Sequence, residues 1–544
     1  MTPSDRSMIS SDSLCSKEIL SSPPLRMPKK PVWLHLAVTL LLALWLPVCS
    51  SHASGQSGRV FFVQPAGDDK NSGLSPEQAW RTIDRVNAAN FTPGDQILFS
   101  GGATYNGRLR FDAGDSATTS DRLVLSSSGD ARAIIDGGNG SGLVAEDCHH
   151  LTIKNLVFRG SGRKAGNEAD GVYITRCRQV EVDSIEVHGF QHAGVLVHIC
   201  DSVRITHVYA HDNGFAGIHV TGTTIWDSSR YDNHHLYIGQ CIAENNPGDP
   251  TVIDNHSGNG ILASSTDRGL IEYCEAFNNG WDMPWHGNGP VGIWIWDSRN
   301  FIIQHCISHD NKSAPDAADG GGFDLDGGTS DSIIQYCLSF DNQGPGIGLF
   351  EFGAGKVWQN NVIRYNISQD DGKNGQGSLA IWKGEAGGAI RNCDIYNNTF
   401  YNSNQNGPNL CVQNNWQGFR FFNNVFVYNG PFLMAGNRLQ DERFENNCYW
   451  NLSGNQEFLN HVNIRTWAEE TGNEMRGGRF VGIYAEPRLY NSGGARLTFP
   501  LLLHGPLTEY QPISASPLID AGLNLEKMYG VNPGERDIRG TSIP

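Results

Sequence analysis

The feature that most constrains the fold of this chain is a recurring short apolar strand followed by a polar turn. The segments 151–158, 203–210, 302–308 and 333–339 all show this pattern. A repeat of fixed size is typical of architectures in which each unit buries its apolar face against its neighbours. Aligned on one another, the repeats share one column at intervals of 23 to 33 residues: Leu156, Ile185, Val208, Cys241, Cys274, Cys306, Cys337, Asn366, Asn398, Asn424 and Cys448.

A second strand follows each turn and usually begins with glycine, as in the segments 217–221, 292–296, 322–326 and 346–350. Alternate positions of these strands are aliphatic, which is the period of a β-strand. The repeat is too short to hold crossover helices between its strands. We therefore expect an all-β fold, a single parallel β-helix in which each turn of chain stacks about 4.8 Å from the one before it.

Stacked turns place like residues over like, and the column of cysteine and asparagine fits this expectation. Inward asparagines can hydrogen-bond from turn to turn, and inward cysteines pack as small apolar side chains. We expect buried free thiols, while neighbouring turns also lie within reach of a disulfide. No C-x₂-C pair is present, which argues against a zinc site. The pairs that stay open as disulfides are Cys241/Cys274, Cys306/Cys337 and Cys177/Cys200.

The N-terminal segment 1–53 has the order of a secretory signal peptide. Arg26, Lys29 and Lys30 precede an apolar run over residues 33–48, and small residues follow at 51–53. The apolar run is short for a membrane-spanning helix. We expect cleavage, export to the extracellular space or the periplasm, and no membrane contact afterwards.

Caps are expected at both ends of the coil, because a stack of strands exposes open edges. Residues 54–110 should form the N-terminal cap, residues 111–450 the β-helix and residues 451–544 a C-terminal cap. Ser75 followed by Pro76 is typical of a helix N-terminus. We therefore predict a short amphipathic helix that starts there and buries Ile83 and Val86.

The charge balance excludes one class of partner. Lys and Arg total 40 against 57 Asp and Glu, a formal net charge of −17. A nucleic-acid-binding surface needs clustered positive charge, so no nucleic-acid partner is expected. Aromatic residues at 10% and hydrophobic residues at 39% argue against a disordered chain. We expect a folded, exported monomer.

Both ends of the mature chain resemble a known group of proteins. The segments 63–69 (VQPAGDD), 71–76 (NSGLSP) and 79–83 (AWRTI) resemble the opening of secreted right-handed parallel β-helix proteins of the pectate-lyase-like superfamily. Family-9-type pectate lyases share that style of opening. The segments 515–522 (ASPLIDAG) and 537–540 (DIRG) are similar to the closing part of many such proteins. The resemblance implies a right-handed coil and activity on a poly- or oligosaccharide, and the architecture hosts hydrolases, lyases, epimerases and adhesins.

Side chains that alternate with the aliphatic ones should point away from the core, and in the middle turns they combine aromatic rings with carboxylates. Aromatic rings stack on the apolar faces of sugars, and two carboxyl groups supply the acid and the base or nucleophile of glycosidic cleavage. We therefore predict a glycoside hydrolase with Asp324, Asp326 and Glu351 as catalytic residues. The residues predicted to bind substrate are Trp294, Trp296, Asp297, His219, Phe350, Trp382 and Lys383.

The spacing of the three carboxylates leaves the stereochemistry open. Asp324 and Asp326 stand two apart on one strand, which separates their backbones by about 6.5–7 Å. Their carboxyl groups can thus approach the ~6.5–9.5 Å of an inverting enzyme. Glu351 lies one turn further along, where its distance from Asp326 can approach the ~5–5.5 Å of a retaining enzyme.

Two other functions remain open from the sequence. A Ca²⁺-assisted polysaccharide lyase or epimerase would use Lys383 or Lys356 as base and oxygen ligands for calcium. Few Arg or Lys residues stand in this region to bind an acidic polymer. The third function is a non-catalytic glycan-binding surface protein. A calcium site would use Asp316, Asp319, Asp324 and Asp326, and no other cofactor is expected.

Long turns in the middle repeats add further aromatic and histidine side chains, in the segments 254–256 and 281–286. Long loops concentrate binding function. We expect these turns to form the walls of the groove between His219 and Trp382.

Overall fold

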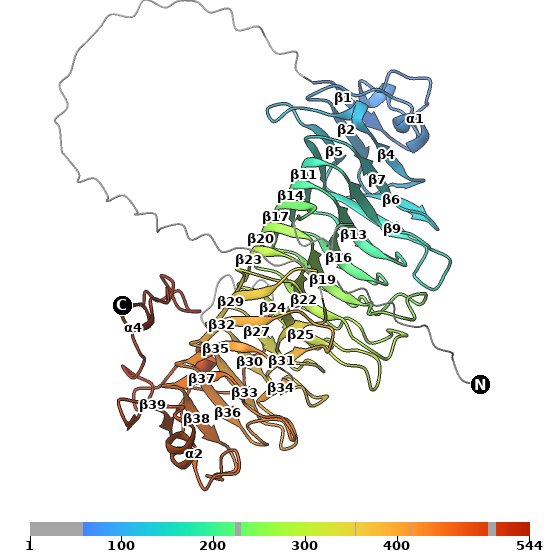
Figure 1. The fold of residues 1–544 in the computed structure, drawn as a ribbon. Coiled ribbons are helices and arrows are strands. Elements are labelled where there is room, and N and C mark those ends of the chain that lie inside the picture. The colour runs from blue at the N-terminus through green and yellow to red at the C-terminus, as the bar shows by residue number, and fades with distance from the viewer. Residues whose placement is uncertain (1–57, 224–229, 354, 414, 499–506, 544) are drawn as a thin grey trace, which may run out of the picture. The chain divides into compact units, whose positions relative to one another are not determined.

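In the computed structural model of the protein, residues 58–223, 230–353, 355–413, 415–498 and 507–543 are described. The predicted signal peptide, residues 1–53, lies outside the described residues. Each turn of the chain contributes one strand to each of three long sheets, and successive turns pair in parallel (Figure 1). The predicted parallel β-helix is therefore confirmed.

The three sheets are called A, B and C below. Within the described ranges, sheet A consists of β1 (Val60–Val63), β2 (Gln96–Ser100), β5 (Leu123–Ser128), β8 (Leu151–Lys154), β11 (Arg178–Asp183), β14 (Asp201–Thr206), β17 (Asn233–Gly239), β20 (Thr266–Glu272), β23 (Arg299–Gln304), β26 (Ile333–Gln335), β29 (Trp358–Arg364), β32 (Ile390–Tyr396), β35 (Gln417–Phe422) and β37 (Glu442–Glu445).

Sheet B follows sheet A along each turn. It consists of β3 (Thr104–Asn106), β6 (Ala133–Gly138), β9 (Leu156–Gly160), β12 (Glu186–His188), β15 (Tyr209–His211), β18 (Ile242–Glu244), β21 (Glu275–Phe277), β24 (Ile307–His309), β27 (Leu338–Phe340), β30 (Ile367–Gln369), β33 (Thr399–Asn402), β36 (Val425–Tyr428), β38 (Cys448–Asn451) and β41 (Ile483–Tyr484).

Sheet C contains the second strand of the repeat and, as shown below, carries the candidate site. It consists of β4 (Leu109–Phe111), β7 (Leu143–Glu146), β10 (Val172–Thr175), β13 (Ala193–His198), β16 (Ala216–Thr221), β19 (Asn259–Ser264), β22 (Val291–Trp296), β25 (Gly321–Leu325), β28 (Ile347–Glu351), β31 (Leu379–Lys383) and β34 (Leu410–Gln413).

The core lies inside the coil and is built from the aliphatic positions of the repeat. Ile293 and Ile295 of β22 are fully buried there, and Phe323 and Leu325 of β25 are buried directly beside them. Parallel pairing in register brings Ile293 opposite Phe323 and Ile295 opposite Leu325. The alternate residues Trp294 and Asp324 pair on the opposite face, as the period of two requires.

The corner between sheets A and B carries an asparagine ladder. The Nδ2 group of Asn366 donates to Oδ1 of Asn398, Asn398 donates to Asn424, and Asn424 donates to Asn447, each at 3.0 Å. The column predicted from the sequence ends at Cys448, which is wrong by one residue. Asn447 occupies the ladder position, and Cys448 pairs with Val425 in sheet B.

The cysteines of the repeat are buried and unbridged. The ten described cysteines are free thiols, so the disulfides that the sequence left open are not formed in this structure. The backbone N–H of Cys241 instead contacts Sγ of Cys274 in the next turn at 3.5 Å. The expected ladder of buried thiols is confirmed.

The N-terminal helix begins later than predicted. Ser75 makes no side-chain capping bond, and η1 (Pro76–Gln78) is a single 3₁₀ turn that ends before Ala79. The helix α1 (Ile83–Asn87) is capped by Thr82, whose side chain accepts from the N–H of Arg85. The chain is extended between the two elements, so the predicted single helix is divided.

Smaller elements cover the ends of the coil. Strands β39 (Met475–Arg476) and β40 (Arg479–Phe480) form an antiparallel pair. Of the described helices, none is both long and apolar enough to span a bilayer. The remaining helical elements are η2 (Ala113–Asp115), α2 (Ile464–Thr471), η3 (Thr508–Tyr510) and α4 (Leu525–Tyr529).

Candidate active site

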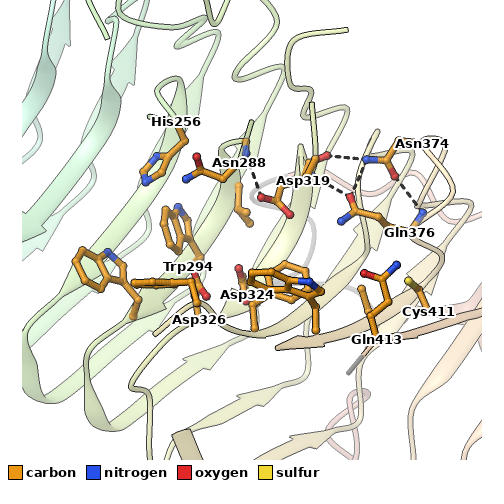
Figure 2. Close-up of a pocket in the computed structure, with 18 of the residues that line it drawn as sticks. His256, Asn288, Trp294, Asp319, Asp324, Asp326, Asn374, Gln376, Cys411 and Gln413 are labelled. Atoms are coloured by element: carbon orange, nitrogen blue, oxygen red, sulfur yellow. Dashed lines mark hydrogen bonds between the residues drawn. The ribbon is translucent and has the colours of Figure 1, made fainter. Parts of the chain in front are cut away.

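A cavity of about 750 Å³ lies on the outer face of sheet C. Its floor comes from β22, β25, β28, β31 and β34, and its walls come from loops at the ends of these strands and from the loop before β19. Figure 2 shows the polar side chains of the walls facing the aromatic and acidic side chains of the floor. The site therefore lies mid-coil, where the sequence predicts it.

The aromatic floor contains the rings predicted to bind sugar: Trp294, Trp296, Phe350 and Trp382. Loops cover this floor more completely than predicted, since Trp294 is only 3% exposed. The indole N–H of Trp294 donates to Oδ1 of Asn259 at 3.0 Å. The indole N–H of Trp296 is buried and has no hydrogen-bond partner in the structure.

Three carboxyl groups face the cavity. Asp324 and Asp326 stand on the floor at and just after the end of β25, on the same face because they are two residues apart. Asp319 comes from the loop before β25, and Figure 2 shows its carboxyl group across the cavity from the two floor carboxylates. The arrangement places carboxyl groups on two sides of one space.

Burial sets the protonation of the floor carboxyls. The side chain of Asp324 is almost fully buried and its Oδ1 has no hydrogen-bond partner. Burial first, and then the charges of Asp326 and Asp319, raise the pKa of Asp324 well above its usual range. Burial also raises the pKa of Asp326 to about 8, although the N–H of Gly327 donates to its Oδ1 at 2.7 Å.

Asp319 is held by more donors than the floor carboxyls. The N–H of Gly289 donates to its Oδ2 at 3.0 Å, and Gln376 also hydrogen-bonds to its side chain. Burial raises the pKa of Asp319 to about 6, and these hydrogen bonds oppose the effect. The cluster thus combines carboxyl groups that keep and lose their protons in different pH ranges.

Apart from Asp319, the polar side chains of the cavity walls are neutral. Asn288 donates from its Nδ2 to Oδ1 of Asn255 at 2.8 Å, and Asn374 donates to Oε1 of Gln376 at 2.7 Å. Burial lowers the pKa of His256 to about 4, so its imidazole is neutral at physiological pH. No Lys or Arg is found among the described residues that line the cavity.

Glu351 does not occupy the predicted catalytic position. Its side chain is fully buried and does not line the cavity. The N–H of Gly328 donates to its Oε2 at 2.9 Å, and the N–H of Gly353 donates to its Oε1 at 2.7 Å. Both oxygens point to backbone, because Glu351 is the last residue of β28 and its side chain turns under the adjoining loops.

Asp297 does not reach the cavity either. It is fully buried, and Nζ of Lys356 donates to both of its carboxylate oxygens at 2.8 Å. The prediction that Asp297 contacts substrate is therefore wrong, because its side chain forms an ion pair with Lys356. It also places Lys356, one of the bases considered for a lyase, in that same pair.

The other predicted site residues lie outside the lining. His219 packs against Phe215, with ring centroids 4.9 Å apart, and the side chain of Lys383 reaches the carbonyl of Gly384 at 3.3 Å. Asp316 is exposed on a loop, apart from the cavity. Within the described ranges, no group of three or more His, Cys, Asp or Glu side chains is placed to hold a metal ion. Of the four carboxylates considered for calcium, Asp316 lies apart from the three that line the cavity.

The sequence did not predict the amide side chains of the cavity walls, and it indicated Asp319 only as a possible metal ligand. Asn374 and Gln376 stand in a loop that interrupts the repeat. Nothing in their local pattern distinguishes them from ordinary turn residues. The signal for Asp319 was the run of glycines that follows it, Gly320 to Gly322, which lets the loop return close to the floor.

Comparison with known proteins agrees with the observed architecture. The model of the family described as "Right handed beta helix region" matches residues 131–249 and 245–416. A curated relative, the lacto-N-biosidase of Bifidobacterium longum subsp. longum, is 22% identical over 514 residues, which cover 73% of this chain and 31% of the relative. The chain therefore spans about a third of the length of that relative.

Solved structures show the same fold. The selenomethionine form of a GH136 lacto-N-biosidase from Eubacterium ramulus is 17% identical, covers 72% of this chain and 67% of its own, and gives a TM-score of 0.52. The native form of the same enzyme is 16% identical, covers 72% and 68%, and gives a TM-score of 0.50. At this identity the likeness describes the fold.

Proposed function

Since this chain belongs to the right-handed β-helix family, a fold that hosts several carbohydrate activities, we propose that it is a glycoside hydrolase acting in the cavity on sheet C. One observation carries the proposal: three carboxyl groups, Asp319, Asp324 and Asp326, face one cavity whose floor is aromatic. Aromatic rings bind the faces of a sugar, and the carboxyl groups supply the chemistry of glycosidic cleavage.

The catalytic pair is Asp319 with Asp326. Cleavage needs one carboxyl group that protonates the glycosidic oxygen and a second that acts as base or nucleophile. Asp324 and Asp326 stand side by side on the floor, whereas Asp319 faces them from the wall (Figure 2). A sugar bound between wall and floor is therefore flanked by Asp319 on one side and Asp326 on the other.

Protonation is consistent with this pair. The pKa of Asp319 is raised to about 6 and that of Asp326 to about 8. Between these values the pair shares one proton, which is the state that acid and base catalysis requires. The charge of Asp319 contributes to the raised pKa of Asp326, so the proton stays on Asp326 while Asp319 is ionised.

Asp324 serves the bound sugar as a neutral hydrogen-bond donor. Burial and the neighbouring carboxylates raise its pKa well above the usual range, and its Oδ1 has no partner. A buried polar atom without a partner is costly unless a ligand supplies one. A sugar hydroxyl in the cavity would accept a hydrogen bond from the protonated carboxyl group of Asp324, which lines the cavity.

The walls favour a neutral glycan. Uronate polymers need positive charge to bind their carboxylates, and the described lining offers amides and a neutral His256. The lysine considered as a lyase base, Lys356, is held by Asp297. The activity named for the Bifidobacterium relative, a lacto-N-biosidase, is also hydrolysis of a glycoside, which supports this choice.

The test is hydrolysis of a panel of neutral aryl glycosides, including the lacto-N-bioside, beside uronate polymers. We expect release of the aryl group from a neutral glycoside and loss of that release in Asp319→Asn and Asp326→Asn. Unsaturated sugar from a uronate polymer, seen by ultraviolet absorbance, would instead establish a lyase. Binding of a glycan with no turnover across the panel would establish a non-catalytic binding protein.

A further inference from the structure

Two buried carboxylates lie behind the floor of the cavity without lining it: Glu351 and Asp297. Burying a charge is costly unless it is paired and hydrogen-bonded. Two such groups beside one active site therefore need a reason. Their partners connect the turn that follows Asp326 with the loop that carries Phe352.

Glu351 joins these two segments directly. One carboxylate oxygen accepts the N–H of Gly328, at 2.9 Å, in the turn that follows Asp326. The other accepts the N–H of Gly353, at 2.7 Å, immediately after Phe352. A single side chain thus sets the separation between the Asp326 turn and the Phe352 loop.

The ring of Phe352 completes the connection. A Cβ atom added at Gly327 would lie only 2.6 Å from Cε1 of Phe352, so the ring rests on the residue next to Asp326. The same ring meets Trp296 edge-on, with centroids 5.8 Å apart. Because Phe352 and Trp296 both line the cavity, the position of the turn also sets the shape of the floor.

Asp297 contacts both the turn that follows Asp326 and the far end of the loop that carries Phe352. Its backbone N–H donates to the carbonyl of Gly327 at 2.7 Å, and its side chain pairs with Lys356, at the end of the Phe352 loop. The ring of Tyr231 lies 4.6 Å from the Lys356 ammonium group. The loop is therefore anchored at both ends, by Glu351 and by Lys356.

We propose that Glu351 is a positioning residue of the hydrolase, which holds Asp326 and Phe352 in their working geometry together with the Asp297–Lys356 pair and without touching the sugar. This inference rests on the proposed function. Misplacement of a catalytic group by about 1 Å can cost 10²-fold in rate. Glu351 therefore affects turnover although it lies outside the cavity.

Glu351 also acts on Asp326 through its charge. The groups that raise the pKa of Asp326 by repulsion are Asp319 and Glu351, and Asp324 titrates beside them. Asp297 is paired with Lys356, although burial raises its pKa to about 7. Removing the charge of Glu351 is thus expected to lower the pKa of Asp326, an effect that a purely structural side chain would not have.

The test is Glu351→Gln, which keeps the size of the side chain and removes its charge and one of its two acceptors. We expect kcat to fall about 10- to 100-fold while KM changes little, because no sugar contact is lost. The alkaline limb of the pH–rate profile should move to lower pH. Asp95→Asn is the matched control: Asp95 is equally buried and paired with Arg59, and it lies near the N-terminal end of the coil.

Gly327→Ala is a second variant that leaves every charge in place. Its methyl group would displace the ring of Phe352, so kcat should again fall while the alkaline limb stays where it is. The double variant Asp297→Asn/Lys356→Met removes the ion pair without leaving a buried charge unpaired. It should retain the fold and lose turnover to a lesser degree than Glu351→Gln.

A loss of kcat in Glu351→Gln no larger than in Asp95→Asn, with an unmoved alkaline limb, would overturn the inference. Failure of the hydrolase proposal would look different, because the wild type itself would then hydrolyse no glycoside. In that case a crystal structure of Glu351→Gln still decides on positioning. A displaced Asp326 turn and Phe352 ring would support it, and an unchanged cavity would end it.

Discussion

Two buried acidic positions of this coil differ in how completely they are hydrogen-bonded. A second asparagine ladder runs along the corner after sheet B, where Asn311 donates to Asn342. Asp371 ends this ladder: its Oδ1 accepts from Nδ2 of Asn342 at 2.8 Å, and its Oδ2 accepts from the hydroxyl of Ser368 at 2.7 Å. Asp324 in the cavity is buried to a similar degree, but its Oδ1 has no partner. Burial raises the pKa of both residues.

The comparison teaches that burial and a raised pKa do not by themselves identify an active site. Asp371 has these properties because it is part of the scaffold, and its hydrogen bonds are made within the coil. Asp324 has an oxygen without a hydrogen-bond partner, and this residue lines an open space together with Asp319 and Asp326. Unsatisfied groups in a native structure call for a functional explanation.

The largest expected effect is the loss of turnover when a carboxyl group of the Asp319–Asp326 pair is removed. Asp319→Ala should lower kcat by about 10²–10⁴-fold, the range for loss of a general acid or base. Sodium azide, which can enter the space that the side chain leaves, should restore part of the activity. The products that Asp319→Ala and Asp326→Ala form with azide should be compared. The comparison shows which member of the pair attacks the sugar or activates the attacking water. No rescue and no loss in either variant would remove the pair from the mechanism.

The pH dependence of kcat/KM sharpens the same distinction. The working state needs one proton on the Asp319–Asp326 pair, whose pKa values are raised to about 6 and about 8. We expect a bell-shaped profile with its maximum between these values. A flat profile across this range would show that the pair does not titrate during catalysis.

A substitution in the asparagine ladder between sheets A and B should lower stability and leave turnover unchanged. Asn398 accepts from both Nδ2 and the backbone N–H of Asn366, and it donates to Asn424 and to Ile363. Asn398→Ala leaves these groups unpaired, at a cost of about 1–3 kcal/mol for each buried group. The melting temperature should fall while kcat per folded molecule is unchanged. A loss of kcat at full folding would show that the ladder reaches the cavity.

The last expected effect is a gain in stability. The pKa of Asp326 is raised to about 8 in the folded protein, against about 3.9 in an unfolded chain. The folded state therefore binds more protons than the unfolded state between these pH values, so stability falls as pH rises through that window. Asp326→Asn removes this effect.

At pH 8 the variant should be more stable than the wild type by up to roughly 5 kcal/mol, since the folded and unfolded pKa values differ by about four units and one unit is worth 1.36 kcal/mol. At pH 3 the two proteins should be nearly equal, because the carboxyl group is then mostly protonated in both states. Thermal unfolding at the two pH values measures the difference. A variant less stable than the wild type at pH 8 would contradict the raised pKa.

The fold could be predicted from the sequence because the repeat encodes it at every turn. The ladder positions recur as Asn397-Asn398, Asn423-Asn424 and Asn446-Asn447, in which the first residue takes a positive φ and the second points inward. Asparagine tolerates that backbone conformation better than most residues. The prediction placed Cys448 instead of Asn447 in the ladder. The last turn is shorter than the turns in the middle of the coil, and the repeat pattern alone does not show which of the two adjacent residues points inward.

The site could be predicted only where it follows the strand period. Trp294, Asp324 and Trp382 face the cavity because alternation on β22, β25 and β31 requires it. Asp297 and Glu351 stand at or beyond the strand ends, where alternation no longer decides the direction of a side chain. Asp319 depends on the conformation of a loop, which a repeat pattern does not encode.

The most direct measurement compares kcat of the wild type, Asp326→Asn and Asp371→Asn on one neutral glycoside at pH 7. Both substitutions replace a buried carboxyl group of raised pKa by an amide of the same shape. We predict that Asp326→Asn loses nearly all turnover and that Asp371→Asn keeps it. Equal loss in both variants, or full activity in Asp326→Asn, would contradict the assignment of catalysis to the cavity on sheet C.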